Sequence, residues 1–497
     1  MLLFVWIAMV LALAGLGGAE ESKCPSTQQD GRLFRGTVNP NVIKAQYAVR
    51  GEVLLRAMEL DKEGKMEIVY CNIGNPQTLG QKPLSFSRRV LSLVLSPELI
   101  PVTRQAFPTD VAARAEKYLS FGPVGAYSDS QGLLGIRQEV AEFLDNRDSQ
   151  PQGTSNPKDI YLTSGASGGV ELLSKVLFRN SNDAMIVPIP QYPIYSAITA
   201  LLDGHFEGYE LDEALGWGLD LNAIELAFQR CQKIGKLPRV LVVINPGNPV
   251  GSILSREQIA GVIDLCRKYR VMIFADEVYQ ANVYLKPFVS FRQVLLEQKY
   301  QDVQLASFHS ISKGVTGECG LRGGFMDFVN FDSGAMQEIY KLASISLCPN
   351  LPGQLAVGLS VNPPKMGEAS YELDFAERQG IFLSLKRRAA KVSQRLNQLE
   401  GVNCQPTQGA MYAFANLTLP IEFVQHAQQL GKHPDGLYSM NLLEQSGIVV
   451  VPGNGFGQKD GTYHFRTTIL PAESVLDKVL DKFELFHKEF MAKWKRS

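Results

Sequence analysis

The sequence predicts an α/β protein, with a large domain built on a mostly parallel sheet flanked by helices and a smaller α+β domain formed from both chain ends. Three short apolar runs predict the sheet, at residues 240–244, 271–275 and 303–308. Runs of this length, rich in β-branched residues, are typical of strands buried on both faces of a parallel sheet. Residues 255–269 predict a helix between the first two runs, because Ser255 can cap it and apolar residues recur at helical spacing. This strand–helix–strand order favours parallel strands.

Segments on either side of these runs extend the prediction. Residues 160–170 predict a strand that runs into a turn of small residues, with a helix over 170–178, and residues 185–192 predict another strand. From about residue 365 the pattern changes, because a long amphipathic helix over 375–399 precedes short strand-like segments. We therefore expect four parts: a targeting segment (1–19), an N-terminal arm with part of the small domain (20–100), the large domain (101–360) and the C-terminal part of the small domain (361–497).

The N-terminal segment differs from the rest of the chain. Residues 2–16 are all apolar or glycine, no charged side chain precedes Glu20, and small residues occupy 17–19. This pattern predicts a secretory-type signal peptide that is cut after Ala19. A membrane anchor stays open, because no Lys or Arg precedes the apolar core and the uncharged stretch nearly reaches the ~20 residues that span a bilayer. A two-step organelle address is a third reading.

We therefore expect a protein that enters the secretory route and is secreted, kept in the ER lumen or passed to an organelle, or a cytoplasmic protein if the segment is not used. The glycosylation sequon at Asn416 is weak support for the secretory route. No later apolar run is long enough to span a membrane, so no stable membrane span is expected after processing.

Composition excludes several classes of function. The chain has 497 residues, is 45% hydrophobic and carries a formal net charge of −1. This charge indicates no nucleic-acid partner and no anionic membrane partner. Seven cysteines occur without a C-x-x-C pair, which argues against a zinc site and against a disulfide scaffold.

The segment around Lys313 is the most informative about chemistry. It follows the third apolar run, has serines at 310 and 312, and precedes Arg322, which lies among glycines. A lysine amine can form a Schiff base with an aldehyde, and hydroxyls together with an arginine suit a phosphate. Pyridoxal 5'-phosphate combines both groups, so the segment indicates a site for this cofactor. The alternative is that Lys313 is one of many solvated lysines.

Polar residues also follow the other two predicted strands. Asn-Pro-Gly-Asn-Pro at 245–249 follows one of them, and Asp276 follows the other. In parallel sheets, ligands bind beyond the carboxyl ends of the strands, so these residues are expected to meet at one site. The small residues at 164–169 precede a helix, where free backbone N–H groups bind phosphate. Each signal alone has a plainer reading: a turn, a strand-end helix cap, or a tight glycine-rich connection.

The assembled motifs resemble those of fold-type I pyridoxal-phosphate aminotransferases, and the particular residues in them resemble those of alanine aminotransferases. The resemblance covers about residues 40–490 and keeps the family's order. It rests on residues 164–167, 190–195, 245–249, 275–279, 307–314, 317–324 and 461–468.

This resemblance implies roles for the residues around the cofactor ring. Lys313 would form the Schiff base, and Asp276 would face the pyridine nitrogen and keep it protonated. Tyr279 and Asn248 would share the ring oxygen, and Tyr192 would stack on the ring.

The resemblance also implies a phosphate cup and a second subunit. Ala166, Ser167, Ser310 and Arg322 would bind the phosphate. Tyr127 would reach the phosphate of the neighbouring subunit, which implies a homodimer with shared active sites.

On the substrate side, Arg466 would hold the α-carboxylate, because a planar guanidinium binds a carboxylate through two hydrogen bonds. Asn248 and the backbone of Gly74 would lie beside the substrate. The expected reaction is ping-pong transamination, L-alanine plus 2-oxoglutarate giving pyruvate plus L-glutamate, with no metal. The alternatives are an aminotransferase for glyoxylate or aromatic substrates, a pyridoxal-phosphate lyase, and a non-catalytic binding or regulatory protein on the same fold.

Overall fold

The structure, a computed structural model, describes residues 33–45 and 51–495. The chain divides into two units, residues 1–43 and 44–497. Of the first unit, the structure describes the turn η1 (Arg35–Thr37) and the start of α2 (Pro40–Lys44). The predicted targeting segment, residues 1–19, lies outside the described residues. In the described part, no helix is both long and apolar enough to cross a membrane.

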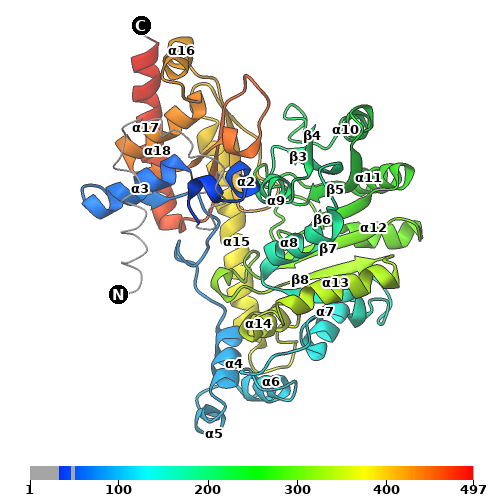
Figure 1. Cartoon of the computed structure of the whole chain (residues 1–497). Helices are drawn as coiled ribbons and strands as arrows, with labels where there is room; N and C mark the ends of the chain where they lie inside the picture. The colour runs from blue at the N-terminus through cyan, green and yellow to red at the C-terminus, as the bar shows by residue number, and fades with distance from the viewer. Residues whose placement is uncertain (1–32, 46–50, 496–497) are drawn as a thin grey trace. The chain divides into compact units, whose positions relative to one another are not determined.

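The second unit contains a seven-stranded sheet that confirms the predicted α/β class (Figure 1). The strands lie in the order β2 (Ile160–Thr163), β8 (Gly324–Val329), β7 (Leu305–Ser310), β6 (Met272–Asp276), β5 (Leu237–Ile244), β3 (Asp183–Ile189) and β4 (His205–Glu210). The five strands from β7 to β4, including β7 just before the Lys313 segment, run parallel to one another. β8 runs antiparallel to both of its neighbours, β2 and β7.

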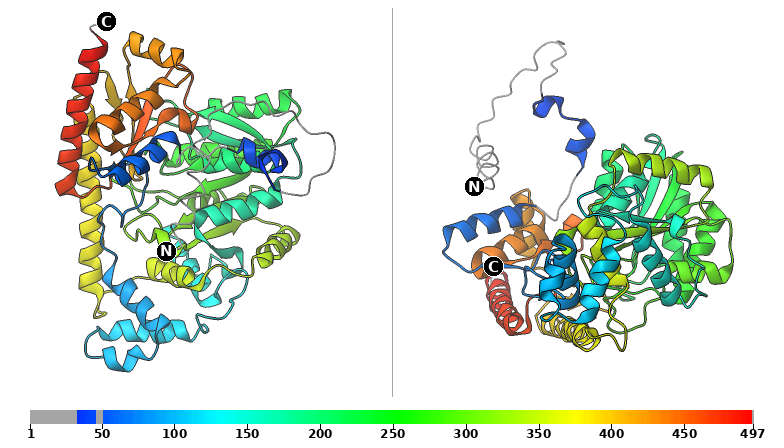
Figure 2. Two further views of the ribbon diagram at one scale, coloured as in Figure 1. Left: turned by 60° about the vertical axis from the view of Figure 1, so that its left-hand side comes forward. Right: turned by 90° about the horizontal axis from the view of Figure 1, so that it is seen from below.

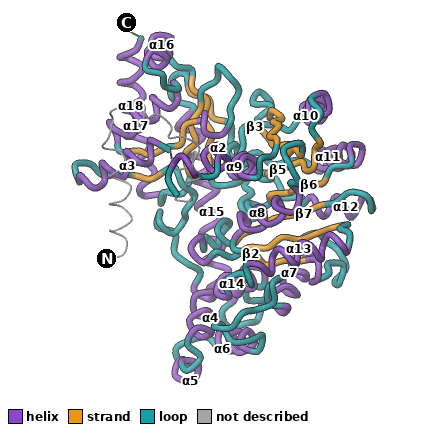
Figure 3. The backbone as a smooth tube through the Cα atoms, viewed as in Figure 1, coloured by secondary structure: helices purple, strands orange, loops and turns teal. Residues whose placement is uncertain are grey.

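Helices cover both faces of this sheet, so its central strands are buried on both sides (Figure 3). Alternate residues of β5, such as Leu241 and Val242, belong to different apolar clusters on opposite faces. One face packs against α10 (Leu221–Lys233), α11 (Arg256–Tyr269) and α12 (Phe291–Gln298). The other packs against α8 (Gly165–Leu177), α9 (Ile194–Leu201) and α13 (Ser333–Ile345). The sheet end at β2 packs against α4 (Ser85–Leu95), α5 (Leu99–Thr103), α6 (Thr109–Leu119), α7 (Leu134–Arg147) and α14 (Leu351–Val361).

Two helix boundaries show how local sequence sets the elements. The helix predicted from Ser255 is α11, where Ser255 and Gln258 form a reciprocal capping box. The helix expected from residue 170 instead begins at Gly165, so the small residues form its first turns rather than a connection. A Cβ at Gly169 would lie 3.3 Å from the Phe308 ring, so glycine lets α8 approach β7 closely.

A second, smaller sheet and its helices form the rest of the unit. Its strands pair antiparallel in the order β12 (Val451–Pro452), β13 (His464–Thr468), β10 (Tyr412–Leu417) and β9 (Val402–Cys404). β1 (Val69–Tyr70) pairs parallel with β11 (Ile448–Val449), so segments from both chain ends meet here. The helices of this part are α3 (Glu52–Glu63), α15 (Tyr371–Leu396), α16 (Ile421–Gln429), α17 (Pro434–Ser446) and α18 (Glu473–Trp494).

The long helices α15 and α18 lie side by side along this smaller part (Figure 2). Ion pairs join them, for example Lys391 to Asp477 at 2.8 Å. The domain limits expected at residues 100 and 360 stay predictions.

A buried ionic cluster fixes the carboxyl end of β6. Arg147 Nε lies 2.7 Å from Asp148 Oδ1, and Arg292 lies 3.4 Å from Asp148 Oδ2 and 3.1 Å from Asp327 Oδ2. Glu277, the residue after β6, lies 3.7 Å from Arg147 and accepts a 2.8 Å hydrogen bond from the Phe291 N–H. Burial raises the pKa of Glu277 and of Asp327 to about 7. Because burial disfavours the charged forms and three carboxyl groups face only two guanidinium groups, Glu277 and Asp327 bind a proton more readily than ordinary carboxyl groups do.

Glu277→Gln is expected to change how stability depends on pH. The folded pKa of Glu277 is about 7 against an ordinary 4.5, so the folded state binds a proton more tightly and loses stability as pH rises through this window. The neutral amide has no such loss. The free energy of unfolding of the variant, relative to that of the parent, should therefore be higher at pH 8 than at pH 5 by on the order of 1–3 kcal/mol. Unfolding midpoints of variant and parent at both pH values measure this, and Glu489→Gln, at an exposed residue, is the control. If variant and parent differ in stability by the same amount at pH 5 and at pH 8, the prediction is wrong.

Candidate active site

A cavity of about 550 Å³ lies at the carboxyl ends of β6 and β7. Its lining comes from the large sheet, from the start of α8, from the loop at residues 73–75 and from the small sheet. Eleven of the twelve residues expected at the site line it: Gly74, Ala166, Ser167, Tyr192, Asn248, Asp276, Tyr279, Ser310, Lys313, Arg322 and Arg466. The sequence motifs, which are far apart along the chain, therefore meet in one place.

Tyr127 is the twelfth expected residue, and it does not line the cavity. Its side chain is 77% exposed in the single chain. A residue that reached into another subunit would have this exposure before assembly, so the structure of one chain neither brings Tyr127 to the site nor assigns it another role.

Asp276 is the last residue of β6 and is buried at the floor of the cavity. Its Oδ2 accepts a 2.7 Å hydrogen bond from the hydroxyl of Tyr195. Burial raises the pKa of Asp276, whereas Tyr195, the Val278 N–H and the Lys313 amine act to lower it. Asp276 is thus a buried carboxylate whose ionised form is supported by fixed donors.

Tyr195 is a site residue that the sequence analysis did not single out. It lies three residues after Tyr192, in the first turn of α9, and is fully buried. The only available signal was its place in the Pro-Gln-Tyr-Pro-Ile-Tyr motif, because its partner Asp276 is 81 residues away.

Lys313 follows β7 by three residues and points its amine into the cavity. Its Nζ donates a 2.9 Å hydrogen bond to the carbonyl oxygen of Gly74 and lies 5.8 Å from the centre of the Tyr279 ring. A Cβ on Gly74 would collide with the Tyr412 hydroxyl and lie 3.1 Å from Lys313 Nζ. Only a glycine allows the backbone at this point to approach both groups.

Hydroxyl and guanidinium groups converge at the start of α8. Arg322 Nη2 lies 3.4 Å from Ser167 Oγ, and its Nη1 lies 3.5 Å from Ser312 Oγ. Ser310 Oγ donates to Ser312 Oγ at 3.1 Å. Together with the free N–H groups of the first turn of α8, these donors form a cup suited to a phosphate.

Arg466 lies in β13, is 1% exposed and points into the cavity. Its Nη1 donates a 3.1 Å hydrogen bond to Asn248 Oδ1, and its Nη2 donates to the carbonyl oxygen of Asn72. Among the described residues, its hydrogen-bond partners are an amide oxygen and a carbonyl oxygen rather than a carboxylate, and its Nε has no hydrogen-bond acceptor. A buried cation without an anion is costly, so this position favours an anionic ligand.

Tyr412 is a second site residue that the sequence analysis did not single out. The Arg466 guanidinium lies 4.0 Å from the centre of the Tyr412 ring, and the Tyr279 ring lies 6.1 Å away, edge to face. Burial acts to raise the pKa of Tyr412, but Lys313, Arg466 and a hydrogen bond with Tyr279 act together to lower it, and the net pKa is lowered. The phenol therefore lies between the two cations of the cavity and is a polar group at its centre.

The strand that carries Arg466 is also joined to the large domain. His464, two residues earlier, stacks on Phe414 with ring centres 4.8 Å apart, and its Nε2 lies 3.2 Å from a Glu213 oxygen. The side-chain amide of Asn416 in β10 donates to the same Glu213 at 3.2 Å. Glu213 lies in the loop after β4, so this network connects the large sheet to β13.

Comparison with known proteins gives consistent results. Residues 100–483 match the family described as aminotransferase class I and II. A probable mitochondrial alanine aminotransferase of Dictyostelium discoideum is 47% identical over 476 residues, which cover 92% of this chain and 89% of that protein. Glutamate–glyoxylate aminotransferase 1 of Arabidopsis thaliana is also 47% identical, covering 92% of this chain and 96% of that protein. The solved structure of an alanine aminotransferase from Pyrococcus furiosus aligns with a TM-score of 0.73 at 25% identity, covering 91% of this chain and 99% of that one.

Proposed function

This chain belongs to the class I and II aminotransferases, and on that premise we propose that it transfers the amino group of L-alanine to 2-oxoglutarate, giving pyruvate and L-glutamate. The observation that supports this most is the shared cavity of Lys313 and Arg466. It places an amine for proton transfer beside a buried guanidinium that lacks an anion.

The described residues fit pyridoxal 5'-phosphate as the cofactor. When bound, it supplies an aldehyde that takes up the substrate's amino group and a ring that accepts electrons. The donor cup of Ser167, Ser310 and Arg322 would hold its phosphate, and the buried Asp276 would face its ring nitrogen. Tyr279 and Asn248 would hydrogen-bond the ring oxygen, while Tyr192 would stack on the ring, and Ala166 would offer a backbone N–H.

Residues from both sheets would orient the substrate. Arg466 would bind the α-carboxylate through its guanidinium, helped by Asn248. Lys313 Nζ, which now donates to the Gly74 carbonyl at 2.9 Å, would move the proton from the substrate Cα to the cofactor's C4', and would move a proton in the reverse direction during the second half-reaction. Gly74 keeps the backbone close to this amine.

A homodimer is the assembly we propose, because Tyr127 is exposed and free to reach another subunit. Asp129 in the same loop accepts a 3.2 Å hydrogen bond from Tyr340 of α13. The end of α13 exposes apolar side chains, with Ile345 76% and Leu347 50% exposed. A second copy covering these side chains would bury apolar area that one chain leaves in water.

Glyoxylate is the alternative amino acceptor, because the glutamate–glyoxylate aminotransferase is as similar as the alanine aminotransferase. The cationic side chains lining the cavity, among the described residues, are Lys313, Arg322 and Arg466. None is left over for a distal carboxylate once the cofactor and the α-carboxylate are bound, so among donors this favours alanine over aspartate, and among acceptors it favours glyoxylate over 2-oxoglutarate.

We propose that residues 1–19 act as a targeting segment, either a secretory signal or part of an organelle address. Relatives described as mitochondrial alanine aminotransferases support an organelle as the destination. N-terminal sequencing of the native protein separates removal near Glu20 from retention of Met1.

Lys313→Ala is expected to abolish transamination, because Lys313 carries the single amine among the described residues that line the cavity. The loss should be at least about 10²-fold in kcat. In the parent, borohydride reduction should fix the cofactor to the peptide that contains Lys313. Lys478→Ala, an exposed lysine of α18, is the control and should keep full activity. Parent-like turnover in Lys313→Ala would refute the assignment.

Tyr195→Phe is expected to weaken the support for ionised Asp276. Loss of the 2.7 Å hydrogen bond raises the pKa of Asp276 further, so the acidic limb of the pH profile of kcat should move to higher pH. Cofactor affinity should fall on the order of tenfold. Asp276→Asn should still bind cofactor yet turn over more slowly than Tyr195→Phe.

Tyr161→Phe is the matched control, because this buried hydroxyl bonds the Met336 carbonyl outside the cavity. If Tyr195→Phe leaves both the pH profile and the cofactor affinity unchanged, Tyr195 has no positioning role.

Alanine is expected to exceed aspartate in kcat/KM by about tenfold or more, because an unpaired distal carboxylate in a closed site is costly. The panel should contain alanine, aspartate, glutamate, glycine and tyrosine as donors, with 2-oxoglutarate and glyoxylate as acceptors. Aspartate or tyrosine as the best donor would overturn the alanine assignment and leave the family untouched. Faster turnover with glyoxylate would favour the alternative acceptor.

A further inference from the structure

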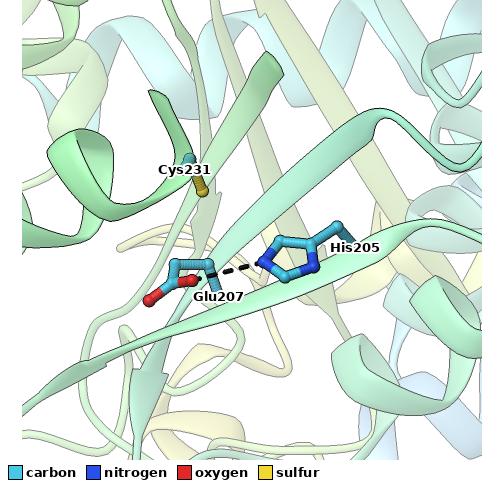
Figure 4. A group of neighbouring side chains, drawn as sticks. All are labelled: His205, Glu207 and Cys231. Atoms are coloured by element: carbon cyan, nitrogen blue, oxygen red, sulfur yellow. Dashed lines mark hydrogen bonds and ion pairs between the residues drawn. The ribbon is translucent and has the colours of Figure 1, made fainter. Parts of the chain in front are cut away.

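Three potential metal ligands converge at the edge of the large sheet (Figure 4). His205 and Glu207 lie two residues apart on the edge strand β4, so both side chains point to the same face. Cys231 lies on α10, which packs over that face. His205 Nε2 is 3.3 Å from Glu207 Oε2, and one ligand atom from each of the three residues lies within 4.8 Å of the other two.

The donor set has a clear chemical preference. An imidazole nitrogen, a carboxylate oxygen and a thiolate sulfur suit Zn²⁺, whereas Mg²⁺ and Ca²⁺ take oxygen ligands. With bonds of about 2.0–2.3 Å, neighbouring ligands of a tetrahedral zinc lie about 3.3–3.8 Å apart. The histidine and glutamate already have this spacing, with 3.3 Å between Nε2 and Oε2, and the sulfur needs to approach by at most ~1.5 Å.

Arg230 is consistent with this role for Glu207. Its Nε donates to Glu207 Oε1 at 2.6 Å, and its Nη2 donates to the Gly208 carbonyl at 2.6 Å. The arginine thus uses one carboxylate oxygen, and the other oxygen faces His205 and remains available. An outer hydrogen bond of this kind orients a ligating carboxylate and is common around metal sites.

Burial at the site differs between the three ligands. Cys231 is fully buried, whereas the side chains of His205 and Glu207 are 26% and 14% exposed. Solvent can therefore reach the ion from the strand side and provide a fourth ligand, while the sulfur anchors it from the helix side.

We propose that His205, Glu207 and Cys231 bind Zn²⁺ with a fourth position open to water, and that this ion ties α10 to the edge strand. On binding, the zinc–sulfur bond forms and the thiol proton passes to solvent. No residue of the catalytic cavity takes part, so the site is independent of the proposed reaction. The cysteine spacing gave no hint of it, because the ligands come from a strand and a helix rather than from one motif.

Zinc titration of the chelator-treated holoenzyme tests the site. Equilibrium dialysis should find one saturable Zn²⁺ per chain, and the ion should raise the unfolding midpoint. Co²⁺ in place of zinc should give a thiolate charge-transfer absorption. His205→Gln and Cys231→Ala should each weaken binding by about a hundredfold or more and abolish the zinc-dependent rise in the midpoint.

Cys266→Ala is the matched control. Cys266 is a buried cysteine of the neighbouring helix α11, in the same apolar cluster but outside the group of three. Its variant should bind zinc as the parent does. Should Cys231→Ala fail to fold, the partly exposed His205→Gln still decides. No saturable binding by the parent, or undiminished binding in His205→Gln, would overturn the proposal.

Discussion

The carboxyl end of β6 is the constraint on which the site depends, because two adjacent carboxylates there face opposite sides. Asp276 faces the cavity, and Glu277 faces the buried cluster of Arg147, Asp148, Arg292 and Asp327. The alternation of side chains along a strand makes this division possible. The ionic cluster holds the strand end from behind, while at the front the Tyr195 hydroxyl, the Val278 N–H and the Lys313 amine favour the ionised form of Asp276 against its burial.

The small domain completes the cavity rather than merely covering it. Arg466 and Tyr412 come from β13 and β10, and the contacts of Arg466 with Asn248 and with the Asn72 carbonyl join three distant segments. The network of His464, Glu213 and Asn416 fixes the same strands to the large sheet. The position of the Arg466 guanidinium relative to the Lys313 amine therefore depends on contacts between the two domains, and not on β13 alone.

Apolar runs were sufficient to predict the buried strands, and the resemblance of the motifs to a known family was sufficient to predict most of the cavity lining. The buried strands ending at Ile244, Asp276 and Ser310 were predictable because continuous apolar runs have few other structures available. Tyr195 and Tyr412 were not, since their importance depends on which groups the fold brings beside them. The start of α8 was misplaced because small residues suggest a turn, whereas close packing on Phe308 makes them helical. Tyr127 is the opposite case. Its motif predicts a role, but the structure of a single chain does not contain the neighbouring subunit that it is expected to contact.

The contacts of Asn416 affect what a glycan at its sequon could report. In the folded chain its amide nitrogen donates to Glu213 and lies 3.2 Å from His464 Nε2, and a sugar on that nitrogen would replace both contacts. A glycan on the Asn416 amide and these two contacts therefore exclude each other. For a chain that enters the secretory route, modification and folding compete in time at this residue. An unmodified Asn416 would then record how quickly the two domains closed, and would not identify the compartment in which they did so.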